Sequence, residues 1–183
     1  MQTAEAAPAG AFHHRLRADT RADHEAVDDR FGRFDLADAD SYRQFLTAHS
    51  LVLPGFEAAL APAALMPGWE QRTAALADDL AALGADMPAP LVPAAAMHGA
   101  ARWGAIYVVE GSRLGGAVLS RRVGAGLPAA YLSAVHRGGA WRRFLAAMDA
   151  AAVDESWRRA AIASARSVFA AYRRAADEAR THG

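Results

Sequence analysis

The sequence predicts an all-α protein, and three observations support this fold class. Hydrophobic residues make up 53% of the 183 residues, and much of that fraction is alanine, the strongest helix former. Apolar residues recur at steps of three and four, which is the period of a helix packed along one side. Valine and isoleucine are scattered, and no long stretch alternates apolar and polar residues as a half-buried strand does.

The chain is expected to form one domain of about seven or eight helices. Residues 1–10 are Ala, Gly, Pro and polar residues, and we expect them to be disordered. The remaining segment, 11–183, is too short for two domains with separate cores.

The first helix is expected to run from Phe12 to Phe31 and to end at Gly32. Its apolar stripe consists of Phe12, Leu16, Thr20, His24, Val27 and Phe31.

The other helices follow from capping residues and from proline and glycine breaks. Asp40 and Ser41 are suitable N-caps, Pro54 interrupts a helical pattern, and Gly84 is a suitable C-cap. The proline-containing stretches 61–68 and 85–93 are expected to be loops. Helices are expected at 41–52, 54–60, 69–83, 94–123, 129–135, 140–150 and 155–180.

Charge and composition exclude several classes of protein. Lys+Arg and Asp+Glu are balanced at 20 each, so the chain has no general basic field to attract nucleic acid or an anionic membrane. The absence of cysteine excludes disulfides, thiolate metal sites and a cysteine nucleophile. No apolar run reaches the ~18 residues of a membrane span, and the first residues do not resemble a secretory signal, so we expect a cytoplasmic protein.

His24 is the first candidate functional residue. It lies on the apolar stripe of the first helix, so its imidazole is expected to point inward, as a metal ligand or as a hydrogen-bonded core histidine. Arg17 lies seven residues earlier, almost two helical turns away on nearly the same face. A cation at that position suits a carboxylate-bearing ligand whose centre is held by His24.

The second candidate feature is a group of glycines inside the helix expected at 94–123. Each glycine costs about 1 kcal/mol relative to alanine in a helix, so their presence requires a reason. Gly111 and Gly115 are one turn apart, with Gly104 two turns before, which predicts a helix face without side chains and a segment able to bend. This face suits either a closely packed neighbouring helix or a flat ligand. A flat, anionic, metal-centred ligand such as haem fits between the two helices.

Two motifs resemble those of the haem oxygenase family. LRADTRADHEAVD (16–28) is similar to the proximal helix of that family, with Arg17, Thr20 and His24 at the spacing of a basic residue, a threonine and the ligating histidine. YVVEGSRLGG (107–116) resembles the distal helix of bacterial members, especially those that occur alongside bacteriophytochromes. The resemblance spans about residues 11–180.

The resemblance implies that His24 ligates the iron of haem, which is both substrate and cofactor. The face at Gly111, Gly115 and Gly116 would cover the other side of the haem, and a water network would supply protons. The products would be biliverdin, carbon monoxide and ferrous iron. The implied partners are O2, an electron donor such as a ferredoxin or flavoprotein reductase, and a bacteriophytochrome that accepts biliverdin. We expect a monomer.

Several further residues complete the expected site. Mammalian-type members have an aspartate that organises the waters where this chain has Ser112, so we expect the network to be anchored elsewhere. Arg142 and Arg143 are joint candidates for a second propionate contact, with a solvated helix face as the alternative. Tyr107 is a candidate for a propionate or the water chain, or an ordinary core tyrosine. The other histidines are interpreted as surface or capping residues, and Trp103, Trp141 and Trp157 as core residues.

Other functions remain open at this stage. A haem carrier or sensor would keep His24 and Arg17 but would not need the glycine face. A thiaminase-like enzyme would need a cysteine, and a di-iron oxidase would need Glu-x-x-His pairs, which Glu110 does not form. A helical interaction module has no specific support.

Overall fold

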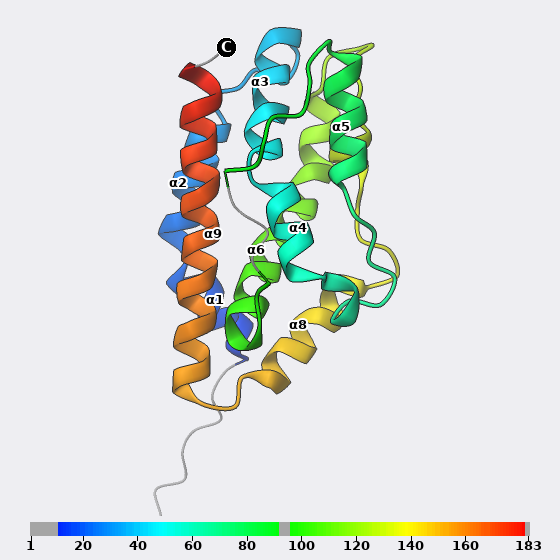
Figure 1. Ribbon diagram of the computed structural model, residues 1–183. Coiled ribbons are helices and arrows are strands. Elements are labelled where there is room, and N and C mark those ends of the chain that lie inside the picture. The colour runs from blue at the N-terminus through cyan, green and yellow to red at the C-terminus, as the bar shows by residue number, and fades with distance from the viewer. Residues whose placement is uncertain (1–10, 92–95, 182–183) are drawn as a thin grey trace, which may run out of the picture.

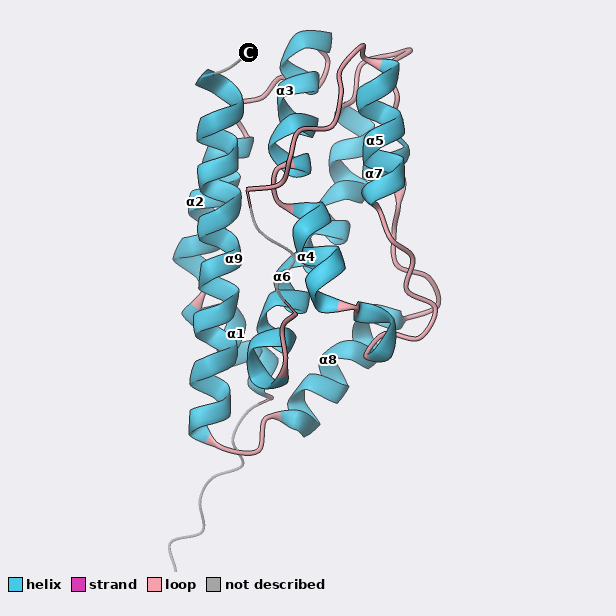
Figure 2. Ribbon diagram, viewed as in Figure 1, coloured by secondary structure: helices cyan, strands magenta, loops and turns pink. Residues whose placement is uncertain are grey.

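The structure, a computed structural model, describes residues 11–91 and 96–181, and all regular structure in this part is helical (Figure 1). Figure 2 shows the helices joined by loops, the longer of which lead into α5 and α6. The all-α prediction is confirmed, whereas the expectation for residues 1–10 lies outside the described residues. The elements are α1 (Phe12–Asp19), α2 (Arg21–Phe31), α3 (Ala39–Ser50), α4 (Leu53–Leu60), η1 (Pro62–Ala64), α5 (Thr73–Ala82), α6 (Gly99–Leu119), η2 (Ser120–Arg122), α7 (Ala130–Ser133), α8 (Ala140–Ala151) and α9 (Glu155–Thr181).

The expected first helix is divided in two at Thr20. This residue leaves helical geometry, with φ −107° and ψ 7°, and its buried Oγ1 donates a hydrogen bond to the carbonyl oxygen of Leu16 at 2.7 Å. Such back-bonding by a threonine competes with the helix hydrogen bonds and bends the chain. The break gives one helix more than the sequence pattern indicates.

Two other helix boundaries differ from expectation for local reasons. α5 begins at Thr73 rather than Trp69, because the buried Glu57 carboxylate of α4 accepts hydrogen bonds from the backbone N–H groups of Arg72 and Thr73 and from the Thr73 hydroxyl. α6 begins at Gly99; the start expected at 94 falls on residues outside the described part. Pro54 lies in the first turn of α4, where its missing N–H costs nothing.

The long helix α9 is the centre of the packing. In Figure 1 it runs along one side of the molecule, and it makes its most extensive contact with α6, followed by α3 and α2. The two long helices come close because α6 has Gly104 at the contact, where a β-carbon would overlap the carbonyl group of Ala161. The Ser164 hydroxyl also donates a 2.7 Å hydrogen bond to the Ala101 carbonyl oxygen. Small residues therefore fix the distance between α6 and α9.

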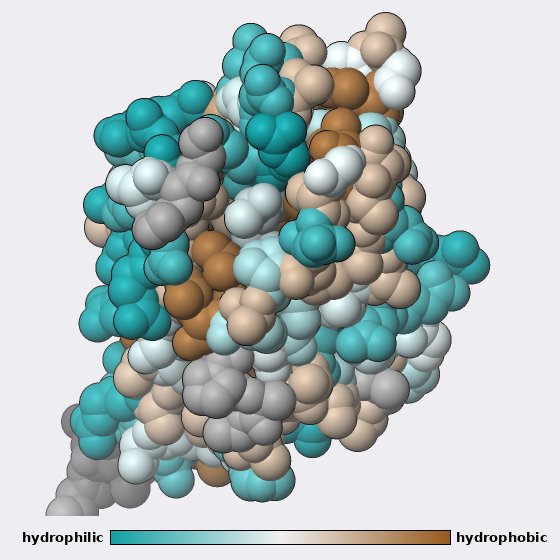
Figure 3. All heavy atoms as spheres, turned by 45° about the horizontal axis from the view of Figure 1, so that its top comes forward, coloured by the Kyte–Doolittle hydropathy of each residue, from teal (hydrophilic) through white to brown (hydrophobic). Residues whose placement is uncertain are grey.

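The face of the molecule drawn in Figure 3 mixes hydrophilic, intermediate and hydrophobic residues. Figure 3 shows one face on which hydrophobic atoms gather in a few places among polar surroundings. Within residues 11–91 and 96–181, no helix combines the length and the apolar character that a bilayer crossing requires.

The packing of α6 predicts opposite effects for two alanine substitutions in the same helix. Gly104→Ala should lower the free energy of unfolding by about 1–3 kcal/mol, because the added methyl group forces α6 away from α9. Gly115→Ala is the matched control, since a β-carbon there meets no atom within 4 Å. It should raise the free energy of unfolding by up to about 1 kcal/mol through helix propensity alone. Urea unfolding of both variants without haem checks this pair, and equal effects would contradict the close approach.

Candidate functional site

The residues singled out from the sequence lie mainly on α1, α2 and α6. α2 and α6 each pack against α9, but they make little or no contact with each other. α9 therefore supports both helices.

His24 does not point into the core, so the expectation that its imidazole is buried is wrong. Its side chain is 62% exposed. The ring lies with its edge toward Phe169 of α9, at a centroid distance of 5.7 Å. Its Nδ1 lies 3.0 Å from a carboxylate oxygen of Asp28, one turn later on α2. The break at Thr20 turns α2 relative to α1, so the apolar stripe of α1 does not continue straight through His24.

Arg17 of α1 and Tyr107 of α6 lie within electrostatic range of each other. Burial raises the pKa of the half-buried Tyr107 phenol, and the positive charge of Arg17 acts on it in the opposite direction. Thr20, between Arg17 and His24, uses its hydroxyl proton in the bond to Leu16.

The glycines of α6 do not form one continuous bare face. Gly104 packs on α9, and a β-carbon on Gly116 would lie 3.0 Å from the carbonyl oxygen of Leu132, so both serve helix packing. Gly111 faces the Trp141 indole at van der Waals distance, and only Gly115 of these four opens on free space. The two interpretations left open by the spacing therefore apply to different glycines: Gly104 and Gly116 serve packing, and Gly115 leaves the backbone open.

Ser112 is turned toward a buried arginine that the sequence analysis missed. The Arg72 guanidinium donates to the Ser112 hydroxyl oxygen at 3.1 Å and to the carbonyl oxygen of Val109 at 2.7 Å. The Ser112 hydroxyl in turn donates to the Val109 carbonyl oxygen at 2.6 Å. The Arg72 side chain is 3% exposed, and its Nε is buried without a hydrogen-bond partner among the described residues.

A second part of this polar network surrounds His49. The Tyr131 hydroxyl lies 2.8 Å from Nδ1 of His49, and the rings of Tyr131 and Tyr172 pack against the imidazole. Burial, assisted by the charge of Arg72, lowers the pKa of His49 to about 3, so the imidazole stays neutral. The Tyr172 hydroxyl is also buried without a partner in the described part of the chain. His49 was expected to be a surface or capping residue, but its side chain packs between Tyr131 and Tyr172; the i, i+4 spacing from Phe45 on an apolar stripe was the available signal.

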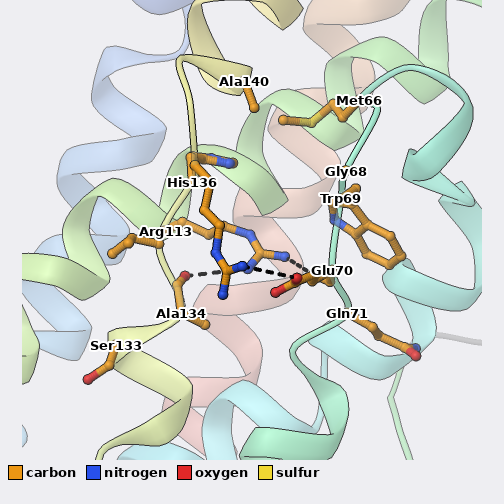
Figure 4. Close-up of a pocket in the computed structure, with 12 residues that line it drawn as sticks. Met66, Gly68, Trp69, Glu70, Gln71, Arg113, Ser133, Ala134, His136 and Ala140 are labelled. Carbon is orange, nitrogen blue, oxygen red and sulfur yellow. Dashed lines mark hydrogen bonds and ion pairs between the residues drawn. The ribbon is translucent and has the colours of Figure 1, made fainter.

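Another network holds the opposite side of the same turn of α6. The Glu110 carboxylate is fully buried and accepts hydrogen bonds from the Trp69 indole N–H at 2.9 Å and from Arg113 Nε at 2.7 Å. His136 Nε2 lies 2.9 Å from the Glu110 carbonyl oxygen, so His136 is not a simple surface residue either. Of these residues, Trp69, Arg113 and His136 border a cavity of about 150 Å3 between the segments 66–71 and 133–137 (Figure 4). Arg113 also donates to the backbone oxygens of Glu70 and Ala134, and so ties both loops to α6.

Arg142 and Arg143 lie in the first turn of α8 and are exposed. Arg143 bonds back to the carbonyl oxygen of Gly138, and Arg142 lies beside Gly139. Neither is brought to Arg17 by a contact of its own. Their neighbour Trp141 does reach α6, at Gly111 and at Tyr107, whose ring centroid is 5.6 Å away.

The described residues fit haem better than a metal ion held by several side chains. No group of three or more His, Asp and Glu residues within 11–91 and 96–181 is placed to share a metal ion. Haem carries its own metal and supplies the other bonds to it. Such a ligand can be served by a single exposed imidazole, an arginine and a glycine that opens on free space.

Comparisons with known proteins agree with this fit. No protein-family model matches the chain. A heme oxygenase of Xanthomonas campestris pv. campestris (strain 8004) is 38% identical over 144 residues, which cover 73% of this chain and 87% of that protein. Among solved structures, the heme oxygenase of Neisseria meningitidis, studied with NO and CO bound, superposes with a TM-score of 0.76 and 28% identity, over 93% of this chain and 92% of that one. Since the relative, the fold and the residues available for a single-histidine haem site agree, the chain belongs to the haem oxygenase family.

Proposed function

We propose that this haem-degrading enzyme holds haem between α2 and α6, with His24 as the iron ligand, and converts it to biliverdin, carbon monoxide and ferrous iron. The observation that carries the proposal is the exposed His24 imidazole with a carboxylate on its Nδ1 side. Histidines that bind metals usually direct their second ring nitrogen to such a partner. Asp28 therefore favours the tautomer with the proton on Nδ1 and the lone pair on Nε2.

The Phe169 ring, nearly perpendicular to the imidazole, gives it a second contact, which limits its rotation. A ligand ring that is oriented before binding loses less conformational entropy when it binds the metal. Through Phe169, α9 thus supports His24, the proposed iron ligand on α2.

Arg17 and Tyr107 are proposed to hold one propionate of haem. They come from the two sides of the proposed site, and Arg17 already influences the Tyr107 phenol. A guanidinium can pair with a carboxylate through two hydrogen bonds, which fixes direction as well as position. Arg142 and Arg143 stay candidates for the second propionate, since their helix reaches α6 through Trp141.

The exposed part of α6 is proposed to cover the face of the haem opposite His24. Gly115 leaves the backbone open, and the neighbouring Leu114 and Val118 are 51% and 62% exposed. Exposed apolar side chains beside a bare backbone suit a flat apolar ring. When bound, haem supplies the iron at which O2 is reduced by an external electron donor, and its own ring is the substrate. The contribution of α6 is to exclude water and to limit which edge of the ring is attacked.

The network around Arg72 is proposed to anchor the waters that deliver protons. Ser112 does not replace the aspartate, because its hydroxyl proton is bonded to Val109 and its oxygen accepts from Arg72. The unpaired Arg72 Nε and Tyr172 hydroxyl are the atoms that ordered water commonly satisfies. His49 remains neutral because its pKa is lowered to about 3, so it can accept and donate hydrogen bonds at neutral pH without adding a buried charge.

The partners and setting of the reaction stay predictions. O2, a ferredoxin or flavoprotein reductase as electron donor, a bacteriophytochrome as acceptor of biliverdin, a monomeric state and a cytoplasmic location are inferred from the sequence and its resemblance. Loss of the haem spectrum when a reductant and O2 are added distinguishes this enzyme from a haem carrier, which would retain it.

The first test of the proposal is His24→Ala. This variant should lose the histidine-ligated ferric spectrum, although haem can still enter an apolar site. His14→Ala is the control, because His14 is also an exposed histidine of the N-terminal helices. Absorption and resonance Raman spectra of both variants with one equivalent of haem make the comparison. A ligand field that survives His24→Ala unchanged would refute the assignment.

A second test addresses the exposed face of α6. Gly115→Leu places a bulky side chain where a β-carbon meets no protein atom, so the protein should stay folded and slightly more stable without haem. Ring cleavage should slow by at least about tenfold, as expected if a displaced substrate costs about 1.4 kcal/mol of transition-state stabilisation. Biliverdin formation is followed at 25 °C against Gly115→Ala. Normal turnover by the leucine variant would remove Gly115 from the site.

A third test uses Arg17→Ala to examine how the haem is oriented. A partly exposed ion pair contributes on the order of 1 kcal/mol, so haem affinity should fall by less than about tenfold while His24 ligation persists. The loss of one propionate anchor should broaden the mixture of biliverdin isomers. Chromatography of the products decides the point, with Arg15→Ala as control because Arg15 pairs with Glu155 elsewhere on the surface. An unchanged affinity and a single unchanged isomer would show that Arg17 is only a surface charge.

A further inference from the structure

The helix α2, which carries the proposed iron ligand, is held on α9 in different ways along its length. None of its residues is buried, and all of them belong to the described part of the chain. In its second half, Val27 and Phe31 pack against the hydrophobic core, and the Phe31 ring contacts the rings of Phe45 and Tyr172. These apolar contacts anchor the end of α2 that follows His24.

The first half of α2 is attached to α9 through one carboxylate. Among residues 21–25, which the structure describes in full, Asp23 is partly buried and the other four are exposed. Its Oδ1 accepts a hydrogen bond from Arg173 Nη1 of α9 at 2.9 Å. Its Oδ2 lies 3.6 Å from Arg166 Nε, which also belongs to α9. Two guanidinium groups of α9 therefore hold the residue that precedes His24.

Arg166 also reaches across the break at Thr20. Its Nη2 donates a 2.7 Å hydrogen bond to the carbonyl oxygen of Asp19, the last residue of α1. The last carbonyl groups of a helix have no partner within the helix, so a guanidinium there supplies a missing hydrogen bond. Because Arg166 contacts both Asp19 and Asp23, it fixes the direction in which α2 leaves α1.

The Phe169 ring, which contacts His24, belongs to the same face of α9. Arg166, Phe169 and Arg173 are separated by three and four residues, a spacing that places them on one side of a helix. Phe169 therefore lies between the two arginines that hold Asp23. The contact between Phe169 and His24 depends on the same placement of α2 against α9.

We propose that Asp23 is a positioning residue for His24, an inference that rests on the proposed haem site. Held by Arg166 and Arg173, it keeps the first half of α2 against α9 and the imidazole in place to bind the haem iron. The Asp23 and Arg173 side chains are 23% and 26% exposed, so dissolved salt screens their attraction in part. The apolar contacts in the second half of α2 are not weakened by salt in this way. Ionic strength should therefore loosen the end of α2 that carries His24.

The first experiment measures hydrogen–deuterium exchange in the haem-free full chain. The informative amides are those of residues 24–27, which bond to the carbonyl groups of residues 20–23, as His24 N–H does to Thr20. In Asp23→Asn these amides should exchange about threefold faster, while those of residues 28–31 change little. Exchange at residues 24–27 that stays at the wild-type rate would overturn the inference.

Asp177→Asn is the matched control for this measurement. Asp177 of α9 pairs with Arg30 of α2 at 3.2 Å, so its loss removes an ion pair between the same two helices. Phe31 already anchors that end of α2. The control should leave the exchange at residues 24–27 unchanged, and an effect there equal to that of Asp23→Asn would overturn the special role of Asp23.

The second experiment examines the iron ligand with haem bound. Asp23→Asn should weaken haem binding about threefold to fivefold and should shift or broaden the ferrous iron–histidine stretch in the resonance Raman spectrum. Asp23→Glu, which keeps the charge, should restore both. Wild-type affinity should fall as NaCl is raised from about 0.05 M to about 1 M, and the affinity of Asp23→Asn should fall less, because one of its ion pairs is already absent.

Arg173→Met separates the ion pair from the favourable effect of a negative charge in the first turn of α2. It retains Asp23 but removes the 2.9 Å hydrogen bond, so it should reproduce the exchange and Raman changes of Asp23→Asn. Added to Asp23→Asn, it should have little further effect. Effects that add, or an unchanged iron–histidine stretch in both single variants, refute only the role of Asp23. A histidine ligand field that survives His24→Ala refutes the proposed site itself.

Discussion

The position of α6 depends on one buried guanidinium, that of Arg72. An arginine in the interior is costly unless its charge and its N–H groups are matched. Here the guanidinium bonds to the carbonyl of Val109 and the hydroxyl of Ser112, lies over the ring of Tyr131 at 5.5 Å, and has the Glu57 carboxylate 3.9 Å away. Because Glu57 also caps α5, the same charges connect α4, α5 and α6.

The turn of α6 beside Gly111 is consequently held from two sides. Arg72 bonds to the carbonyl of Val109, and His136 bonds to the next carbonyl, that of Glu110. Nearer the start of the same helix, the contact between Gly104 and Ala161 sets the distance to α9. A helix that carries several glycines would otherwise bend easily. The surrounding contacts give it a defined position while a β-carbon on Gly115 would meet no atom within 4 Å.

Two groups of side chains lie beside this turn of α6. Arg72 and Tyr172 each have a buried polar atom without a hydrogen-bond partner in the described part of the chain, close to the bonded pair of His49 and Tyr131. On the other side, Trp141 stacks on Phe144 and on His136, which bonds to the Glu110 carbonyl oxygen. Ordered water commonly satisfies unpaired buried polar atoms, whereas stacked rings offer it few partners.

The sequence by itself determined the helical class, most helix positions, and the family, because helix periodicity, glycine and proline breaks, and two local motifs depend on neighbouring residues. It also led to the hypothesis that His24, Arg17 and Gly115 belong to one ligand site. Only the tertiary structure decided that Gly104 and Gly116 serve packing, that His24 is exposed rather than buried, and that Arg72 and His49 approach α6. Those outcomes depend on contacts between residues far apart in the chain and on the break at Thr20, and helical periodicity carries no information about which distant helix supplies a partner.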